Sequence, residues 1–339
     1  MNSIGLLATD LDGTLIGSAN ELPLYADFSD RIARLREDDD AVWVACTGRT
    51  FSSFWEFFLP VRRMGIIPDY VIVRHAYIFK RTSMGFLPHV SWNIAMLVQL
   101  WKEGKASRQA IDHWHQTVTG GAMGVSTIRR QRFRLSLRFD SEESASVAAD
   151  MLREKSMAFT HLQVYNVGRD VDVRLVPSTK GLALSELGQR IGIGRDGILA
   201  IGNGNNDISM LDGKVAALTG CPANSDEQVF HTVHRAQGHI AEHRALRGVI
   251  EILDAYAEGA IRSDMPVGLE MVRAIPSQTS KKRSHGMPRR RSQHSHPLLF
   301  ASIVYAGLLV FACFDILPFS HIIRKPLDLL ISLLAHVFS

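Results

Sequence analysis

Cysteine is scarce in this chain, and its few copies are too far apart to act together. Three cysteines occur among 339 residues, at Cys46, Cys221 and Cys313. Their odd number and wide spacing match neither a disulfide framework nor a thiolate metal site. This usage excludes the disulfide-rich secreted scaffolds and fits a reducing compartment.

The opening residues lack the pattern of a secretory leader. They show no charged region followed by a long apolar stretch, and the short run IGLLAT stops at Asp10. We therefore interpret residues 4–9 as a buried strand and not as a signal peptide.

Acidic residues are absent from one basic stretch, residues 281–291, which contains six Lys/Arg. The net charge is +4, but the rest of the chain is close to balanced, so the overall charge says little about the folded part. We expect no nucleic-acid partner, because a basic cluster just before an apolar segment is more simply explained by anionic lipid head groups.

The chain has 339 residues, a length that allows about two domains, and two patterns of predicted elements occur within residues 1–261. Buried strands alternating with helices predict an α/β fold with a parallel sheet and helices on both faces. An α-β-β-α-β-β order interrupts this pattern and predicts an inserted antiparallel α+β module with one covered face. The first pattern covers strands at 4–9, 41–49, 69–73 and 197–201 and helices at 24–37, 50–63, 180–191 and 239–257; the second covers helices at 92–116 and 141–155 and strands at 122–128, 131–139, 159–165 and 171–176.

Two carboxylates, Asp10 and Asp12, follow the first predicted strand in the run DLDGT. Side chains two residues apart on a strand point to the same side. The carboxyl end of a parallel strand is where open α/β sheets bind ligands. Repulsion between the two carboxylates predicts a cation or a shared proton, and Mg²⁺ suits such an all-oxygen site. One carboxylate can then act as a nucleophile while the other handles a proton.

Two further motifs suit a phosphate group. Thr47, Gly48 and Arg49 end the second predicted strand, where a hydroxyl and backbone N–H groups can hold a phosphate oxygen. Lys180 opens a predicted helix and supplies a positive charge for phosphate. Taken singly, these residues are also explained as a helix N-cap turn and a solvated surface lysine.

The loop Asn203–Asp207, which includes Asn206, follows the fourth predicted core strand. Its oxygen-bearing side chains in a glycine-rich loop suit a hard cation. An ordinary Asn/Gly turn is the alternative interpretation of this loop by itself.

In their order along residues 1–260, DxDGT, TGR, Lys-Gly and GNGNND resemble the motifs of the haloacid dehalogenase (HAD) superfamily. The resemblance implies a Rossmann-like HAD core at residues 1–80 and 176–261, with a C2-type cap at residues 81–175. The runs DVRLVPSTKGLAL and GHIAEHRALRGVIEIL are similar to those of sucrose-phosphate-phosphatase and Cof-type sugar phosphatases.

The resemblance implies a Mg²⁺-dependent phosphatase. The role that it implies for Asp10 is to attack phosphorus and become an aspartyl phosphate. The role that it implies for Asp12 is to protonate the leaving oxygen and then activate water. Thr47, Gly48 and Lys180 hold the phosphoryl group. The implied Mg²⁺ ligands are Asp10, the backbone carbonyl of Asp12, Asn203 and Asp207; Arg49, His75 and Asn206 are candidates for substrate contact or loop support.

Asn203 departs from the family, which usually has Asp at this position. Asparagine keeps an oxygen ligand but removes one negative charge, so the affinity for Mg²⁺ should fall unless Asp207 compensates. His75 can equally be a structural histidine. The arginines of the predicted cap hairpin form either a solvated face or a contact with an anionic substrate; they are Arg129, Arg130, Arg132 and Arg134.

Beyond residue 261 the composition changes. Residues 262–296 predict a basic flexible linker. Residues 297–319 reach about the 20 residues needed to span a bilayer, so we expect a C-terminal hydrophobic, transmembrane helix there. A short hydrophobic tail follows at residues 320–339. The preceding Lys/Arg cluster favours a membrane anchor with the catalytic domain in the cytoplasm. A helical hairpin docked on the folded part is the alternative.

The leading hypothesis is a phosphomonoester hydrolase that acts on a small sugar phosphate or a related metabolite near a membrane. A catalytically weak, membrane-tethered binding module is the first alternative, and Asn203 is its main support. A phosphotransferase or mutase that uses the same aspartyl phosphate is the second.

Overall fold

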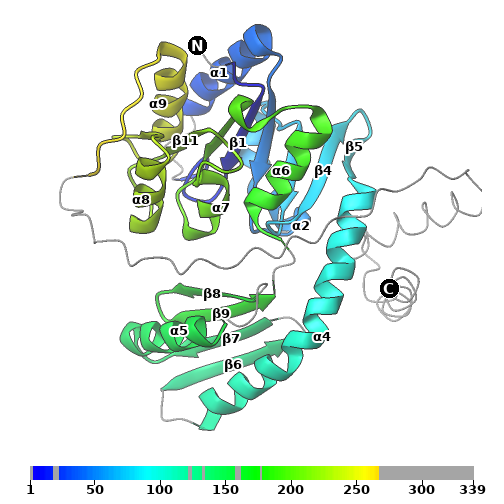
Figure 1. Ribbon diagram of the computed structural model, residues 1–339, viewed down its shortest axis with the longest axis vertical. Coiled ribbons are helices and arrows are strands. Elements are labelled where there is room, and N and C mark those ends of the chain that lie inside the picture. Colours follow the sequence, from blue (N-terminus) through cyan, green and yellow to red (C-terminus); the bar gives the residue numbers. More distant parts are fainter. Residues whose placement is uncertain are drawn as a thin grey trace, which may run out of the picture.

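The computed structural model describes residues 3–17, 23–120, 124–131, 134–156, 162–175 and 178–266 (Figure 1). A core sheet has the strand order β12-β11-β10-β1-β2-β3-β4-β5. Strand β1 pairs in parallel with β10 and β2, whereas β4 is antiparallel to β3 and to β5. The strands are β1 (Leu6–Asp10), β2 (Val42–Cys46), β3 (Tyr70–Val73), β4 (Tyr77–Thr82), β5 (Gly85–Pro88), β10 (Ile198–Ile201), β11 (Leu218–Cys221) and β12 (His239–Ile240).

Helices cover both faces of the core sheet because its central strands are apolar on both sides. In β1, Leu7 packs into one hydrophobic cluster, and its neighbours Leu6 and Ala8 pack into the other. The first cluster is closed by α1 (Leu24–Asp39), α2 (Phe51–Phe57), α3 (Leu59–Arg63) and α9 (Ala245–Glu258); the second is closed by α6 (Lys180–Ile191), α7 (Ile208–Leu211) and α8 (Glu227–Arg235).

The inserted module, here called the cap, has its own antiparallel sheet in the order β6-β7-β9-β8. Its elements are α4 (Val90–Gly120), β6 (Val125–Gln131), β7 (Arg134–Phe139), α5 (Glu142–Ser156), β8 (Leu162–Val167) and β9 (Asp170–Leu175). The predicted α-β-β-α-β-β order is therefore confirmed. Helix α4 runs from the core to the cap (Figure 1), and the side chain of Asn93 fixes its start to β4 through two hydrogen bonds with the backbone of Ile78.

Three details of the prediction are wrong. The core sheet is mixed rather than parallel, because residues 77–88 form a hairpin at its edge. The predicted core–cap boundary after residue 80 falls inside β4, and the core sheet continues to Pro88. The predicted helix at residues 239–257 begins only at Ala245, since His239 and Ile240 pair with β11.

The predicted membrane segment at residues 297–319 and the tail at residues 320–339 lie outside the described residues, as does the predicted linker from residue 267 on. Within the part of the chain that the structure describes, no helix is both long and apolar enough to cross a membrane.

Candidate active site

Lys180 lies between two aspartates at the carboxyl end of the core sheet. Its Nζ donates to Asp10 Oδ1 and to Asp207 Oδ1, each at 2.5 Å, and all three side chains are buried. Helix α6 begins at Lys180 because the side chain of Thr179 caps it by accepting from the backbone N–H of Leu182. The structure thus brings the first and third motifs together with the end of the fourth.

Burial and charge act against each other in this cluster. Burial, together with the negative charge of Asp207, raises the pKa of Asp10 to about 7, although Lys180 opposes the shift. Burial lowers the pKa of Lys180, but the charges of Asp10 and Asp207 outweigh it and raise that pKa overall. Two carboxylates share one ammonium group, so the cluster has a net negative charge when Asp10 is ionised.

Asp207 shapes the loop that contains it. Its Oδ2 accepts hydrogen bonds from the backbone N–H groups of Asn203 and Gly204, at 3.0 and 2.9 Å. A Cβ at Gly202 would come within 2.6 Å of the Asp207 side chain, so only glycine leaves room for this carboxylate. These contacts are those of a positioning residue, and direct binding of Mg²⁺ by Asp207 stays a prediction. Asn206 lies in the short helix η3 (Asn205–Asp207), with its Oδ1 beside Gly204.

Asn203 faces the DxDGT loop. The hydroxyl of Thr14 donates to Asn203 Oδ1 at 2.9 Å, and a Cβ at Gly13 would lie 2.7 Å from Asn203 Nδ2. Asn224, which the sequence prediction missed, donates from Nδ2 to the Gly13 carbonyl at 2.8 Å. Two loops nearly two hundred residues apart in sequence are therefore joined directly.

Asp12 has a different environment from Asp10. Its side chain is 46% exposed and forms an ion pair with Arg49, whose Nη2 lies 2.5 Å from Asp12 Oδ1. The guanidinium also lies over the ring of Phe57, 3.5 Å from the centroid, and donates to Ser53 Oγ at 3.3 Å. Arg49 is therefore fixed on two sides and holds Asp12 at the open side of the site.

The loop after β2 is supported by the turn after β3. Asp10 pairs with Cys46 in the β1–β2 register, so Thr47 follows directly beside the end of β1. Thr47 Oγ1 accepts from the backbone N–H of Arg49 at 3.1 Å, and the Thr47 carbonyl accepts from the backbone N–H of His75. A Cβ at Gly48 would lie 2.7 Å from the His75 ring, so glycine permits this close approach.

His75 joins the core to the cap. Its ring stacks on Tyr165 of β8 with the centroids 6.4 Å apart, and the guanidinium carbon of Arg174 lies 5.2 Å from the Tyr165 centroid. Burial, with the positive charges of Lys180 and Arg174, lowers the pKa of His75 to about 3. His75 is therefore neutral, and Nδ1 has no hydrogen-bond partner among the described residues. Sequence reasoning missed Tyr165 and Arg174.

The donor atoms at this edge suit Mg²⁺. They are oxygens, from the carboxylate of Asp10, the backbone of Asp12 and the amide of Asn203, whose Oδ1 keeps a second lone pair beside the Thr14 contact. Among the described residues, no group of three or more His, Cys, Asp or Glu side chains is arranged to hold a metal. A magnesium site here would therefore depend on amide and backbone oxygens as well as on carboxylate.

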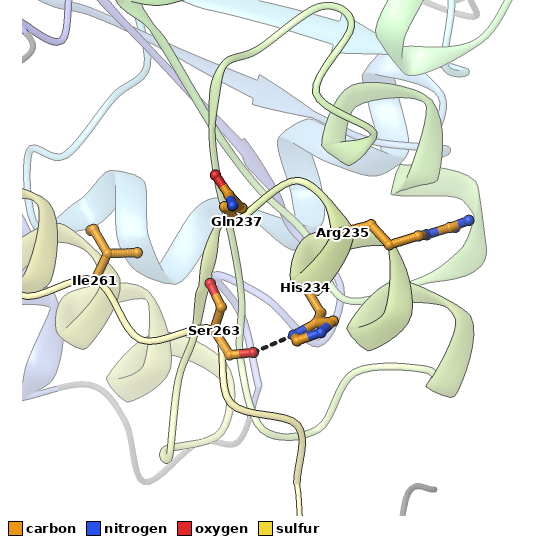
Figure 2. A pocket seen from close by; sticks show the side chains of 5 residues that line it. All are labelled: His234, Arg235, Gln237, Ile261 and Ser263. Carbon is orange, nitrogen blue, oxygen red and sulfur yellow. Dashed lines mark hydrogen bonds between the residues drawn. The ribbon is translucent and has the colours of Figure 1, made fainter. Parts of the chain in front are cut away.

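A separate hollow beside the end of α8 is not part of this cluster (Figure 2). It is lined by His234, Arg235, Gln237, Ile261 and Ser263. His234 Nδ1 lies 2.6 Å from the Ser263 carbonyl oxygen. None of the predicted site residues lines this hollow.

Comparisons with known proteins identify the family of this chain. A sequence model of the sucrose-6F-phosphate phosphohydrolase family matches residues 4–257. A phosphoglycolate phosphatase of Halorubrum lacusprofundi is 27% identical over 226 residues, which cover 65% of this chain and 85% of that protein.

Two solved structures share the fold. The sucrose-phosphatase of Synechocystis, in complex with sucrose and phosphate, matches with a TM-score of 0.53 and 20% identity over 76% of this chain and 99% of its own. A HAD/COF-like hydrolase of Plasmodium vivax has a TM-score of 0.52 and 15% identity, over 76% of this chain and 96% of its own. The chain therefore belongs to the sucrose-6F-phosphate phosphohydrolase family and is a phosphatase of the HAD superfamily.

Proposed function

We propose that this phosphatase is a Mg²⁺-dependent phosphomonoester hydrolase that acts through an aspartyl phosphate on Asp10. The observation that carries the proposal is the buried Lys180, which holds one oxygen of Asp10 and one of Asp207. A lysine in this position fixes the carboxylate of Asp10 and places positive charge where phosphoryl oxygens would develop negative charge.

The contacts of Asp10 suggest which of its oxygens reacts. Lys180 binds Oδ1, so Oδ2 is the oxygen proposed to attack phosphorus. The bond between phosphorus and the substrate oxygen then breaks, and the leaving alkoxide takes a proton from Asp12, which has taken it from solvent on release from Arg49. In the second half, Asp12 takes a proton from water, the resulting hydroxide attacks phosphorus, and the bond to Asp10 breaks, which releases inorganic phosphate.

The difference in exposure between the two aspartates supports these roles. A buried carboxylate is shielded from water and suits the nucleophile, whereas a general acid and base must reach both the leaving group and solvent. Asp12 is accessible and is positioned by Arg49. An arriving phosphate dianion competes with Asp12 for this guanidinium, which frees Asp12 for proton transfer.

Asp10, the backbone carbonyl of Asp12 and Asn203 would hold the Mg²⁺ ion. When bound, the ion supplies positive charge that offsets the phosphoryl oxygens and the net negative charge of the buried cluster. The buried Asp10 has a pKa of about 7 without it, so a nearby cation favours the ionised form that attacks.

The proposed substrate is a small sugar phosphate or a related phosphorylated metabolite. Its support is the family match, the phosphoglycolate named for the curated relative and the sucrose and phosphate bound in the Synechocystis structure. The cap meets the core beside the site through Tyr165 and His75, and a cap over the site favours small substrates.

Phosphate release by the full chain tests the proposal. The chain is assayed on a panel of sugar phosphates and phosphorylated acids, with Mg²⁺ and with EDTA. We expect release only with Mg²⁺ and none from Asp10→Asn, while the exposed matched control Asp196→Asn stays active. Release that survives EDTA, or an active Asp10→Asn variant, would contradict the proposal; transfer of phosphate to an alcohol instead of water would favour the phosphotransferase.

A further inference from the structure

The cap sheet has one apolar face and one polar face. Leu135 and Val173 pair across β7 and β9 and are buried in the cluster that α5 covers. Because successive side chains of a strand point to opposite faces, Arg134, Asp172 and Arg174 lie on the face away from α5. We call these three residues the arginine cluster.

The arginine cluster lies on the face that meets the active site. Tyr165 pairs with Asp172 across β8 and β9, so both side chains share that face. The Tyr165 ring is the one that stacks on His75 of the core. The guanidinium carbon of Arg174 lies 5.2 Å from the centroid of the same Tyr165 ring, so Arg174 and His75 contact one aromatic ring between the cap and the core.

The arginine cluster carries more positive than negative charge. Arg134 donates to both oxygens of Asp172, at 2.9 and 2.7 Å, and Arg174 donates to Oδ2 at 2.7 Å. The carboxylate of Asp172 thus accepts hydrogen bonds from two guanidinium groups. Arg134 and Arg174 also stand directly opposite each other in the β7–β9 register, where like charges destabilise a sheet. The single carboxylate of Asp172 offsets only one of these two charges, so the cluster keeps an excess positive charge.

Both arginines keep donors for an anionic ligand. Their side chains are 40% and 39% exposed, so a solute can reach them. The Nε of Arg174 is buried and has no hydrogen-bond partner among the described residues, so a solute meets the exposed part of this guanidinium. A guanidinium with free donors binds carboxylate and phosphate oxygens strongly and directionally.

We propose that the arginine cluster, Arg174 above all, binds a second acidic group of the substrate while its phosphoryl group lies at Asp10. The inference rests on the proposed function and specifies the substrate class: a small phosphate monoester that also carries a carboxylate or a second phosphate. A substrate whose remaining part has only hydroxyl groups would leave the extra positive charge unpaired.

Matched substrate pairs test this inference. The full chain is assayed with glucose 1-phosphate against glucuronic acid 1-phosphate, which differ in a carboxylate, and with fructose 6-phosphate against fructose 1,6-bisphosphate. We expect kcat/KM to be higher for at least one acidic member by about tenfold or more. The two pairs distinguish a carboxylate from a second phosphate as the preferred group. Equal or better turnover of both neutral members overturns the proposal.

Variants assign the preference to Arg174. We expect Arg174→Gln to lower kcat/KM for the preferred acidic substrate about 10- to 100-fold, mainly through KM, and to leave the neutral partner nearly unchanged. Arg174→Lys should keep part of the preference, because the charge remains. Arg138→Gln is the matched control, since Arg138 is an exposed arginine of the neighbouring strand β7 that faces Asp170 at 3.7 Å. An equal loss on acidic and neutral substrates would show a structural role and overturn the inference.

Binding measurements distinguish a failure of this inference from a failure of the proposed function. Calorimetry with Asp10→Asn measures affinity for the same pairs without turnover. Acid-selective binding that Arg174→Gln abolishes supports the anion site even if the native chain releases no phosphate, and only the hydrolase proposal then fails. Turnover by the native chain, with no acid preference in either assay, leaves the hydrolase and overturns the anion site.

Discussion

Arg49 holds Asp12 at the open side of the site, with Nη2 at 2.5 Å from Oδ1, while Asp10 two residues earlier is held by the buried Lys180. The carboxylates of Asp10 and Asp12, at and just after the end of β1, therefore have different cation partners and different access to water. In the proposed mechanism, this asymmetry separates a nucleophile from an acid and base without any difference in side-chain chemistry.

Replacing Arg49 should impair turnover more than folding. We expect Arg49→Gln to lower kcat/KM about 10- to 100-fold, because Asp12 loses its positioning contact and the substrate loses a cation. Phosphate release measures the effect, and Arg81→Gln, which removes another arginine–aspartate pair of the core, is the control. Unchanged kinetics in Arg49→Gln would show that the ion pair has no part in the reaction.

Replacing Lys180 should abolish activity and destabilise the fold. Lys180→Met leaves two buried carboxylates without their cation, which typically costs about 3–5 kcal/mol. This loss of unfolding free energy should be smaller at low pH, where Asp10 becomes protonated. Urea unfolding at pH 5 and pH 8 checks both statements. Lys214→Met is the comparison, because Lys214 is 82% exposed in its pair with Asp212. A stable Lys180→Met protein would contradict the buried geometry.

Acid should destabilise the native chain partly through His75. The folded pKa is about 3 and the ordinary value is 6.5, so the unfolded chain binds more protons between these values. The contribution of His75 to the free energy of unfolding is thus fully present above about pH 6.5, and it falls as the pH drops toward 3. At pH 5 the loss is about 2 kcal/mol.

The His75→Gln variant isolates this contribution. Its unfolding free energy should fall less between pH 7.5 and pH 5 than that of the native chain, as measured by urea unfolding at both pH values. Identical slopes in His75→Gln and the native chain would mean that His75 is not kept neutral.

Restoring a carboxylate at residue 203 should tighten magnesium binding. Asn203→Asp adds a negative charge beside the DxDGT loop, where the Thr14 hydroxyl can still donate to it. We expect the Mg²⁺ concentration for half-maximal phosphate release to fall about tenfold. Asn205→Asp, in the same loop, is the matched control. No change in the Mg²⁺ dependence would remove residue 203 from the metal site.

Residues 297–319 are predicted to anchor the chain in a membrane. We expect the full chain to sediment with membranes and to require detergent for release, whereas a chain ending at residue 266 stays in the supernatant. High salt separates this anchor from attraction by the basic stretch alone, because salt screens charges but does not extract an apolar helix. Release of the full chain by salt would contradict a spanning segment.

Much of the fold could be predicted because its signals are local. A buried strand must be apolar on both faces, and the acidic or hydroxyl-bearing residues that end it interrupt the run, as at Asp10 and Thr47. The period-two pattern of RFRLSLRF likewise indicated the half-covered cap strand β7. The hairpin at residues 77–88 was missed because its short edge strands have mixed patterns, which do not show whether they extend the core sheet.

The sequence by itself determined the order of the motifs, the two-part architecture and the chemical types gathered at the strand ends. Only the tertiary structure decided their partners: Lys180 between Asp10 and Asp207, Asn224 on the Gly13 carbonyl, and Tyr165 on His75. These contacts join residues from separate strands and from separate domains. The local periodicity of a sequence predicts the face of a helix or strand on which a side chain lies. It does not predict which side chain from a distant part of the sequence contacts it there.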